Sequence, residues 1–376
     1  MINYQKPHIN SKVLMVIPSY YPKIGGAEKQ LSILADELNK QGVLSKILTR
    51  RLPDTKKTQK INGTNVVRLF SKFYPIGFLI SLIYFLFSER VNFTHIHVHT
   101  LNSPLIVCAV FGFFFNIPVI AKVTRTGIGS QIDTYQSTFV KRKLFTIINH
   151  MVSAFVAITR DVENSLIESK VKKSKIYRIG NGVDVKNKNS TNQAKKIRIC
   201  YVGRLIERKR VDWVIKSIAE LYHNDNIKDI ELSIVGDGEN KTELHKITSD
   251  LGLTDIVNFY GSVSQDMVSK ILSEHSVFIL PSNSEGLSNA LLEAMSNALL
   301  VIATDIPANS ELIESEVNGL LFNDLPELTA CIKKYCLHKE KFDSFRQNAH
   351  RTIVNNFSIS MIAQQYNFLY KEIENR

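Results

Sequence analysis

The chain has 376 residues, of which 44% are hydrophobic, so it is long enough for two ordinary domains with separate cores. Its charge is unevenly distributed: residues 1–188 contain 27 Lys and Arg against 10 Asp and Glu, whereas the remaining residues contain 20 against 25. The excess of positive charge predicts an anionic partner for the first half, either nucleic acid or membrane headgroups. No C-x-x-C spacing occurs, which argues against a zinc site and a disulfide framework and fits a reducing cytosol; the cysteines are Cys108, Cys200, Cys331 and Cys336.

The N-terminal segment 1–11 is polar and lacks the apolar core of a signal peptide. An apolar run at 12–18 predicts a strand, and an amphipathic pattern at 28–41 predicts a helix, with Gly25 and Gly26 in the loop between them. Two adjacent glycines let backbone amides approach a phosphate or a sugar, although such a pair more often marks only a turn.

The rest of the first half alternates between predicted strands and helices. The two longest apolar runs, 78–87 and 105–120, predict buried helices and not membrane spans: the first is too short to span a bilayer, and a glycine, an asparagine and a proline interrupt the second. Neither run excludes a helix that lies on a membrane. The alternation predicts a parallel, doubly wound sheet. The further predicted strands are 44–49, 66–69, 95–99 and 119–123.

Three histidines alternate along the strand predicted at 95–99. Period two places His95, His97 and His99 on one face of the sheet. Metal ligation would need cysteine or acid partners, which the sequence does not supply nearby, so no metal site is predicted. His99 stands at the carboxyl end of the strand, where an α/β fold binds its ligand, and is expected to lie nearest to substrate.

A basic run, Lys141, Arg142 and Lys143, is flanked by aromatic and aliphatic residues, and a second basic run follows at 170–175. Basic residues mixed with aromatic ones are typical of a helix on an anionic membrane surface. Nucleic acid and an ordinary solvated face remain alternatives, although no recognised nucleic-acid module is present.

A polar, Asn-rich stretch that ends at residue 196 predicts an interdomain linker. We therefore assign 1–187 to a first domain, 188–196 to the linker and 197–358 to a second domain. A new alternation predicts strands at 197–202, 231–235, 257–260 and 276–280 and helices at 211–221, 241–251 and 267–274. The fold class is thus α/β, with two tandem doubly wound, Rossmann-like domains that face each other across a ligand-binding cleft.

Two strand ends of the second domain carry residues suited to a nucleotide diphosphate. Gly203 and Arg204 follow the first strand, with Lys209 five residues further on. The guanidinium fork and the ammonium charge can together neutralise a diphosphate, although alone they are typical of ordinary surface. Gly236 follows the second strand and leaves room for a nucleotide backbone or base.

The end of the strand at 276–280 leads through a turn into a predicted helix. A helix start favours an anion, and the amides that would face it belong to Gly286, Leu287 and Ser288. Glu285 lies in the turn, facing the crevice. Glu293 lies on the first turns of the helix, where a carboxylate can accept hydrogen bonds from two vicinal hydroxyls of a ribose. In a simpler alternative, Glu293 belongs to a solvated polar stripe.

Five segments occur in a fixed order: IGNGVD at 179–184, GRLIERK at 203–209, IVGDGE at 234–239, FYGSV at 259–263 and PSNSEGLSNALLEAM at 281–295. Their series resembles the retaining glycosyltransferases of the GT-B fold, in the large family four that uses nucleotide-diphosphate sugars. The resemblance covers nearly the whole chain and is strongest over 197–322.

The resemblance implies a role for each matching position. Arg204 and Lys209 would hold the donor diphosphate, Glu293 the ribose hydroxyls and Glu285 a hydroxyl of the transferred sugar. The amides of 286–288 would bind the phosphate or the sugar, and the first domain would close over it through Gly25 and Gly26. The last helix, within 359–376, would pack back on the first domain.

One segment departs from the family pattern. After the strand that ends at Val123 the family often has a histidine near the reacting centre, where this chain has Thr124 and Arg125. We therefore expect Lys122, Thr124 and Arg125, together with His99, to contact the acceptor or a phosphate.

The resemblance and the charge pattern lead to one functional expectation. The protein would transfer a sugar, with retention and without metal or cofactor, from a UDP-sugar to a glycan or polyprenyl-linked oligosaccharide in surface polysaccharide biosynthesis. The basic first domain suggests a cytoplasmic protein held peripherally on the inner face of the membrane. A sugar-nucleotide epimerase of related fold is the alternative. A nucleic-acid-binding protein is a weaker one, because it gives Glu285 and Glu293 no use.

Overall fold

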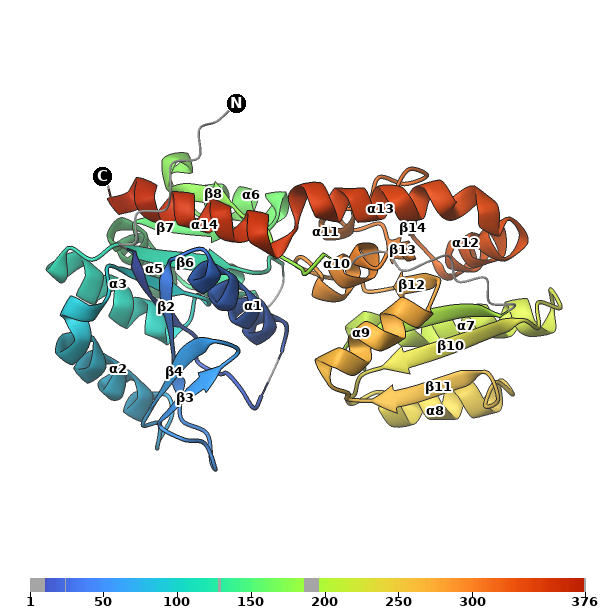
Figure 1. Cartoon of the computed structure of the whole chain (residues 1–376), viewed down its shortest axis with the longest axis horizontal. Coiled ribbons are helices and arrows are strands. Elements are labelled where there is room, and N and C mark those ends of the chain that lie inside the picture. Colours follow the sequence, from blue (N-terminus) through green and yellow to red (C-terminus); the bar gives the residue numbers. More distant parts are fainter. Residues whose placement is uncertain (1–10, 24, 128–129, 186–195, 375–376) are drawn as a thin grey trace. The chain divides into compact units, whose positions relative to one another are not determined.

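The computed structural model describes residues 11–23, 25–127, 130–185 and 196–374 (Figure 1). The chain divides into two compact units, one formed by residues 1–182 together with 359–376 and the other by residues 183–358. Of the predicted linker, residues 188–195 lie outside the described part.

The first unit is built on a sheet of eight strands in the order β3-β4-β2-β1-β5-β6-β7-β8. Neighbouring strands pair in parallel, except for the antiparallel hairpin of β3 and β4. The strand bounds are β1 Lys12–Val16, β2 Leu44–Arg50, β3 Thr58–Ile61, β4 Thr64–Leu69, β5 His95–Val98, β6 Val119–Val123, β7 Ala154–Ala157 and β8 Ile176–Arg178.

Helices cover both faces of this sheet, as a doubly wound fold requires. One face packs against α1 and α14, whose apolar side chains share a core with alternate residues of the strands, among them Val13 and Met15. The helices α2, α3 and α5 pack in series on the other side. The helix bounds are α1 Gly26–Lys40, α2 Ile76–Glu89, α3 Ser103–Phe115, α4 Gln131–Gln136, α5 Phe139–Met151, α6 Arg160–Glu168 and α14 Ile359–Glu374.

The helices α2 and α3 correct one prediction. Both were expected to be buried because they are apolar throughout, but each has one buried side and one exposed side. On α2, Phe78 and Leu82 are fully buried, whereas Ile80 is 63% and Tyr84 76% exposed. Within the described part of the chain, no helix combines the length and the apolar character that crossing a bilayer requires.

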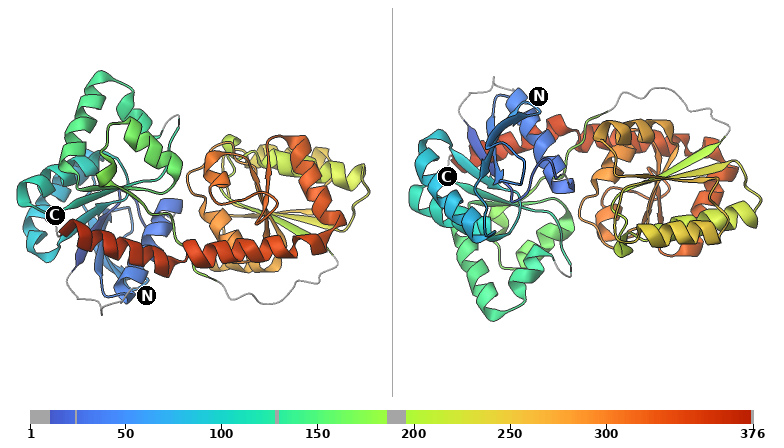
Figure 2. Two further views of the ribbon diagram at one scale, coloured as in Figure 1. Left: turned by 90° about the horizontal axis from the view of Figure 1, so that it is seen from above. Right: turned by 90° about the horizontal axis from the view of Figure 1, so that it is seen from below.

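The last helix, α14, belongs to the first unit although it follows the whole second unit in sequence (Figure 2). Its apolar residues recur every three or four positions, which makes one continuous face. That face includes Tyr366 and Tyr370, both fully buried, and it packs on α1 and β5.

The second unit holds six parallel strands in the order β11-β10-β9-β12-β13-β14. These are β9 Ile197–Val202, β10 Ile230–Val235, β11 Val257–Gly261, β12 Val277–Leu280, β13 Leu300–Thr304 and β14 Leu320–Phe322. The helices are α7 Val211–His223, α8 Lys241–Asp250, α9 Gln265–Glu274, α10 Asn289–Ser296, α11 Pro307–Ser310, α12 Leu325–Leu337 and α13 Asp343–Asn356.

The strand order of the second unit creates a switch point. The chain runs outward from β9 through β10 to β11 and then returns to the other side of β9 with β12. The loops that leave β9 and β12 therefore diverge from adjacent strands, and ligands of open α/β sheets bind at such a point. The fold class predicted from the sequence, two doubly wound α/β domains in tandem, is confirmed.

Candidate functional site

At the carboxyl edge of the second sheet, two loops lie in direct contact. The amide of Gly203 donates to the carbonyl of Val235 at 2.9 Å, and the amide of Leu205 donates to that of Asp237 at 2.9 Å. A Cβ on Gly236, whose φ is 138°, would lie 1.8 Å from the carbonyl oxygen of Gly203. Glycine at 236 is therefore required for the loops after β9 and β10 to meet.

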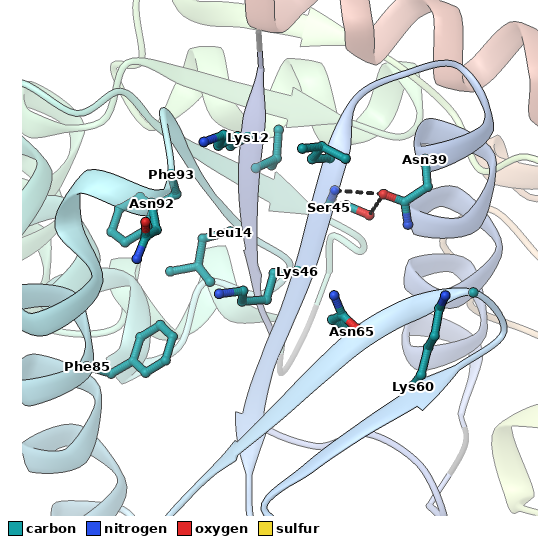
Figure 3. A pocket seen from close by; sticks show the side chains of 13 residues that line it. Lys12, Leu14, Asn39, Ser45, Lys46, Lys60, Asn65, Phe85, Asn92 and Phe93 are labelled. Atoms are coloured by element: carbon teal, nitrogen blue, oxygen red, sulfur yellow. Dashed lines mark hydrogen bonds between the residues drawn. The ribbon is translucent and has the colours of Figure 1, made fainter. Parts of the chain in front are cut away.

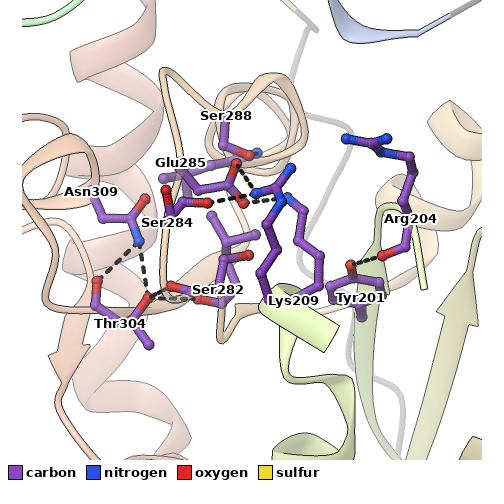
Figure 4. A network of polar contacts seen from close by, with 12 residues as sticks. Tyr201, Arg204, Lys209, Ser282, Ser284, Glu285, Ser288, Thr304 and Asn309 are labelled. Carbon is purple, nitrogen blue, oxygen red and sulfur yellow. Dashed lines mark hydrogen bonds and ion pairs between the residues drawn. The ribbon is translucent and has the colours of Figure 1, made fainter. Parts of the chain in front are cut away.

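Two residues connect the loop after β9 to the loop after β12: Lys209 (Figure 4) and its neighbour Arg208. The amide of Asn283 donates to the Arg208 carbonyl at 3.0 Å, and Nη1 of Arg208 donates to the carbonyl of Ser284 at 2.7 Å. Nζ of Lys209 forms a hydrogen-bonded ion pair with Oε1 of Glu285. Two segments 76 positions apart in the chain are thus joined at one point.

The Lys209–Glu285 pair is largely removed from water. The side chains are 11% and 9% exposed, respectively. Burial lowers the pKa of Lys209, while the negative charge of Glu285 and its hydrogen bond oppose that shift. A second cation, Nη1 of Arg208, lies 4.0 Å from Oε2 of Glu285. The carboxylate therefore sits between two positive charges, and the two side chains predicted to serve diphosphate and sugar are paired with each other.

Arg204 lies beside this pair and not within it. Its side chain is exposed, and its guanidinium stands apart from Lys209 and Glu285 in Figure 4. Its backbone is fixed from below, because the hydroxyl of Tyr201 donates to the Arg204 carbonyl at 2.9 Å. Burial raises the pKa of Tyr201, so this hydroxyl stays a donor. Arg204 thus presents an exposed positive charge from a backbone position that is held by a hydrogen bond.

The loop that leads into α10 is held by residues that the sequence analysis did not select. The hydroxyl of Thr304 donates to the carbonyl of Ser282, and Nδ2 of Asn309 donates to the Thr304 carbonyl at 2.9 Å. At the end of the loop, Oγ of Ser288 caps α10 by accepting from the amide of Leu291 at 3.4 Å. The predicted anion-binding segment 286–288 therefore leads directly into α10, and hydrogen bonds hold the loop before it in place.

Glu293 lies on the second turn of α10 and is 9% exposed. Its Oε2 accepts a hydrogen bond at 3.2 Å from Nε2 of Gln265, the first residue of α9. Gln265 was not predicted, although its place just after the FYGSV segment puts it at the start of the helix beside α10. The carboxylate is therefore oriented by a neighbour before any ligand arrives.

The acceptor-side candidates in the first unit are buried or half-buried. His99, which was predicted to lie nearest to substrate, is 2% exposed, and its ring centroid lies 4.1 Å from that of His97, so its contact with substrate stays a prediction. Lys122 is 3% exposed and donates to Oδ1 of Asn181 at 3.1 Å. Thr124 and Arg125, which follow β6, are half-buried.

The glycines of the first loop begin α1. The amide of Gly25, the N-cap residue of α1, donates to Oε2 of Glu28 at 2.9 Å, so a carboxylate in the first turn of the helix satisfies this amide. Gly26 is the first residue of the helix. The structure of the first unit thus assigns Gly25 a capping role, and a role in closing over a donor stays a prediction.

His95 and His97 of β5 lie on one face with His99, which directly follows the strand, as period two predicts, and the first two contact α14. Nε2 of His95 lies 3.0 Å from the carbonyl oxygen of Tyr370, and Nδ1 of His97 lies 2.8 Å from its hydroxyl. Among the described residues there is no group of three His, Cys, Asp or Glu side chains that could hold a metal. The histidine face therefore serves helix packing.

Each unit contains a pocket that the site residues do not line. One, of about 350 Å³, opens at the amino ends of β1 and β2 beside α2, and its lining includes Lys12, Lys46 and Lys60 (Figure 3). The other, of about 420 Å³, lies in the second unit between Glu207 and Glu243. Neither pocket is lined by Arg204, Lys209, Glu285 or Glu293.

Comparison with known proteins divides the chain in the same place. Residues 24–187 match the family model "Glycosyltransferase Family 4", and residues 196–337 match "Glycosyl transferases group 1". Alpha-D-kanosaminyltransferase of Streptomyces kanamyceticus is 28% identical over 177 residues, which are 46% of this chain and 45% of that protein. Several of the curated matches span only about half of the relative's own length.

Longer matches are found as well. The UDP-Gal:alpha-D-GlcNAc-diphosphoundecaprenol alpha-1,3-galactosyltransferase of Escherichia coli is 27% identical over 327 residues, 78% of each chain. Among solved structures, Anabaena HepE in complex with UDP and glucose is similar in fold, with a TM-score of 0.80 at 20% identity, covering 96% of this chain and 100% of that one.

Proposed function

This chain belongs to the glycosyltransferases of the GT-B fold, and from that premise we propose that it transfers a sugar from a nucleotide-diphosphate donor to a hydroxyl of a glycan or a polyprenyl-linked oligosaccharide. The donor is proposed to be a UDP-sugar, since the Escherichia coli relative is named for UDP-Gal and HepE was solved with UDP. The acceptor class is proposed from the diphosphoundecaprenol in the name of that same relative.

The observation that carries this proposal is the cationic group at the switch point of the second unit. Lys209, Arg208 and Arg204 lie at the end of β9, and the capped start of α10 follows the adjacent strand. When the glycosidic bond breaks, negative charge grows on the departing diphosphate. Fixed cations and helix-start amides stabilise that charge more than they stabilise the ground state, which is what lowers a barrier.

Retention of the anomeric configuration is part of the proposal. In the step envisaged, the bond from the sugar C1 to the diphosphate oxygen breaks, and the acceptor oxygen bonds to C1 on the same face. The acceptor proton passes to the leaving phosphate oxygen. Glu285 supports this assignment, because a carboxylate between Lys209 and Arg208 is a weak nucleophile and is suited to orienting a sugar hydroxyl.

A further part of the proposal is that the reaction needs no divalent metal, because the side chains themselves supply the positive charge. Transfer in the presence of excess EDTA is expected to match transfer without it. A loss of activity with EDTA that Mg²⁺ restores would contradict this part alone. Product NMR, read for the anomeric configuration of the new linkage, tests retention separately.

Removal of the cations tests the site itself. Arg204→Ala is expected to lower the rate of sugar transfer at saturating donor by about 10²-fold or more, because a charge that stabilises the leaving diphosphate is lost. Arg204 is exposed, so its removal is expected to leave the fold intact. Lys216→Ala, a change of an exposed lysine on α7, is the matched control and should transfer normally.

Lys209 needs a paired variant because its removal alone leaves Glu285 buried without its ammonium partner. Lys209→Met combined with Glu285→Gln removes both charges and keeps the shapes. This double variant is expected to fold, as judged by circular dichroism, and to transfer no sugar. Near-normal transfer by both this variant and Arg204→Ala would show that the diphosphate binds elsewhere. Conversion of the donor without any acceptor would point instead to an epimerase.

A further inference from the structure

The most unusual surface of the molecule is the outer side of α2. Large apolar side chains are exposed on it at Ile76, Ile80, Ile83, Tyr84 and Phe87, with exposed fractions between 43% and 76%. Their spacing of three or four residues places them on one side of the helix. The opposite side is fully buried against the sheet, so α2 is apolar all round while only half of it is covered.

The apolar surface continues onto α3 and the start of α5. Phe87 of α2 makes edge-to-face contacts at 5.3 Å with both Phe111 and Phe115 of α3. Beyond this contact, Phe113 is 51% and Phe114 73% exposed. Helix α5 packs against α3 and begins with Phe139 and Val140, which are 63% and 75% exposed. The exposed apolar residues of α2, of α3 and of the first turn of α5, which we name the α2–α3 surface, therefore lie on three helices packed in series and are not scattered over the molecule.

Positive charges border the α2–α3 surface. Lys72 precedes α2 and Arg90 follows it, each lying over a phenylalanine ring, at 5.5 Å from the Phe73 centroid and 5.6 Å from that of Phe115. Lys143 lies 4.7 Å from the ring centroid of Phe139. The sequences of α2, α3 and α5 contain one acid, Glu89, which is ion-paired to Lys46 at 3.4 Å.

These features select one kind of partner. A protein partner would have to cover a large apolar face, whereas an anionic bilayer matches both the apolar centre and the basic border at once. Spanning is excluded by length, since the 14 residues of α2 make a helix of about 21 Å against the roughly 30 Å of a bilayer core. A helix of this kind lies in the plane of the membrane, with its apolar side in the headgroup region.

We propose that the α2–α3 surface docks on a bilayer containing anionic lipid, with the side chains of α2 and α3 inserted and the basic residues at the headgroups. The inference deepens the proposed function, because a polyprenyl-linked acceptor would then be reached at the membrane that holds it. Its test does not depend on sugar transfer. It concerns only the binding of the whole chain to lipid.

The experiment is sedimentation of the full chain with vesicles of phosphatidylcholine alone or with 30% phosphatidylglycerol. Wild-type protein is expected to sediment with the anionic vesicles. Ile80→Gln combined with Phe114→Gln should weaken that binding by about tenfold or more. Leu337→Gln, at a 60% exposed apolar residue of α12 in the other unit, is the matched control and should bind like wild type. Both changes are at exposed positions, and circular dichroism verifies the fold.

Three outcomes would overturn the inference. The first is equal binding by wild type and the Ile80/Phe114 variant, and the second is no binding by wild type. The third is a stable dimer in lipid-free solution that the variant loses, because it would identify a second copy of the chain as the occupant.

Replacing Lys141, Arg142 and Lys143 with Gln should weaken binding to anionic vesicles only. Donor hydrolysis without vesicles should be equal in wild type and the Ile80/Phe114 variant, and its absence in wild type would count against the proposed function and not against docking.

Discussion

At the scale of single residues, sequence motifs indicated which side chains belong to the candidate site, but only the structure showed which of them contact each other. The GRLIERK and PSNSEGL segments were enough to select Arg204, Lys209 and Glu285. That Lys209 and Glu285 form one pair was not predictable, because it depends on β9 and β12 being neighbours in the sheet. Arg208 was missed because an arginine in a basic loop looks like ordinary surface until its contact with Ser284 is known.

Lys122 shows the same limit and gives a prediction about pH. The sequence places it at the end of β6, but its burial beneath α14 depends on the return of a helix that begins at residue 359. Its ammonium lies 5.7 Å from the Tyr366 ring centroid. The groups that face it are His97 of β5, His99 directly after β5, Tyr366 of α14 and the amide of Asn181. Desolvation lowers the pKa of Lys122 from 10.5 to about 8.

The free energy of unfolding is therefore expected to rise between pH 8 and 10.5. In this range the unfolded lysine still holds its proton while the folded one has released it, so the unfolded state binds more protons. The full rise is about 3 kcal/mol. Lys122→Met should be more stable than wild type at pH 7.5, and the difference should shrink by pH 9.5. Urea unfolding followed by circular dichroism measures this, and a difference independent of pH would show that Lys122 is not desolvated.

At the scale of elements, alternation and periodicity predicted most strands and helices, and the misses have physical causes. The strands β7, β13 and β14 are short apolar runs next to helices. Periodicity alone cannot distinguish such a short run from part of a buried helix. The β3–β4 hairpin did have a signal. Asn62-Gly63 adopts positive φ at both positions, 45° and 80°, as the tight turn between two antiparallel strands requires.

The packing of α14 on β5 gives a prediction at this scale. Tyr370→Phe is expected to lower the free energy of unfolding by about 1–3 kcal/mol, because it removes the 2.8 Å hydrogen bond between the hydroxyl and Nδ1 of His97 and leaves that nitrogen unpaired in the core. Tyr366→Phe is the matched control. Its hydroxyl is also buried but has no hydrogen-bond partner among the described residues, so its loss should cost little. Equal losses in both variants, measured by urea unfolding, would show that the hydrogen bond contributes nothing.

At the scale of the whole molecule, the chain is two α/β units with separate cores, and the features predicted from sequence divide between them. The residues proposed to hold the donor diphosphate and ribose all lie in the second unit, whereas the basic charge and the α2–α3 surface lie in the first. The sequence predicted this division through its charge asymmetry and motif positions. The exposed sides of α2 and α3 were not predicted, because a helix that is apolar all round is expected in a core; the sequence left open only that these helices lie on a membrane.

Because the proposed donor site lies entirely in the second unit, bound nucleotide is expected to slow hydrogen exchange there and not in the first unit. Hydrogen exchange of the full chain, measured by mass spectrometry with saturating UDP, is expected to slow at 203–209 and 281–296 and to stay unchanged over α2 and α3. The reason is that a ligand specific to the folded site suppresses the openings that allow exchange there. Arg204→Ala should reduce the protection, and Lys216→Ala should keep it. The charge and the helix start proposed to bind the diphosphate both belong to the second unit. Protection that appears only in the first unit would therefore place the diphosphate away from β9 and α10. Undiminished protection in Arg204→Ala would lead to the same conclusion.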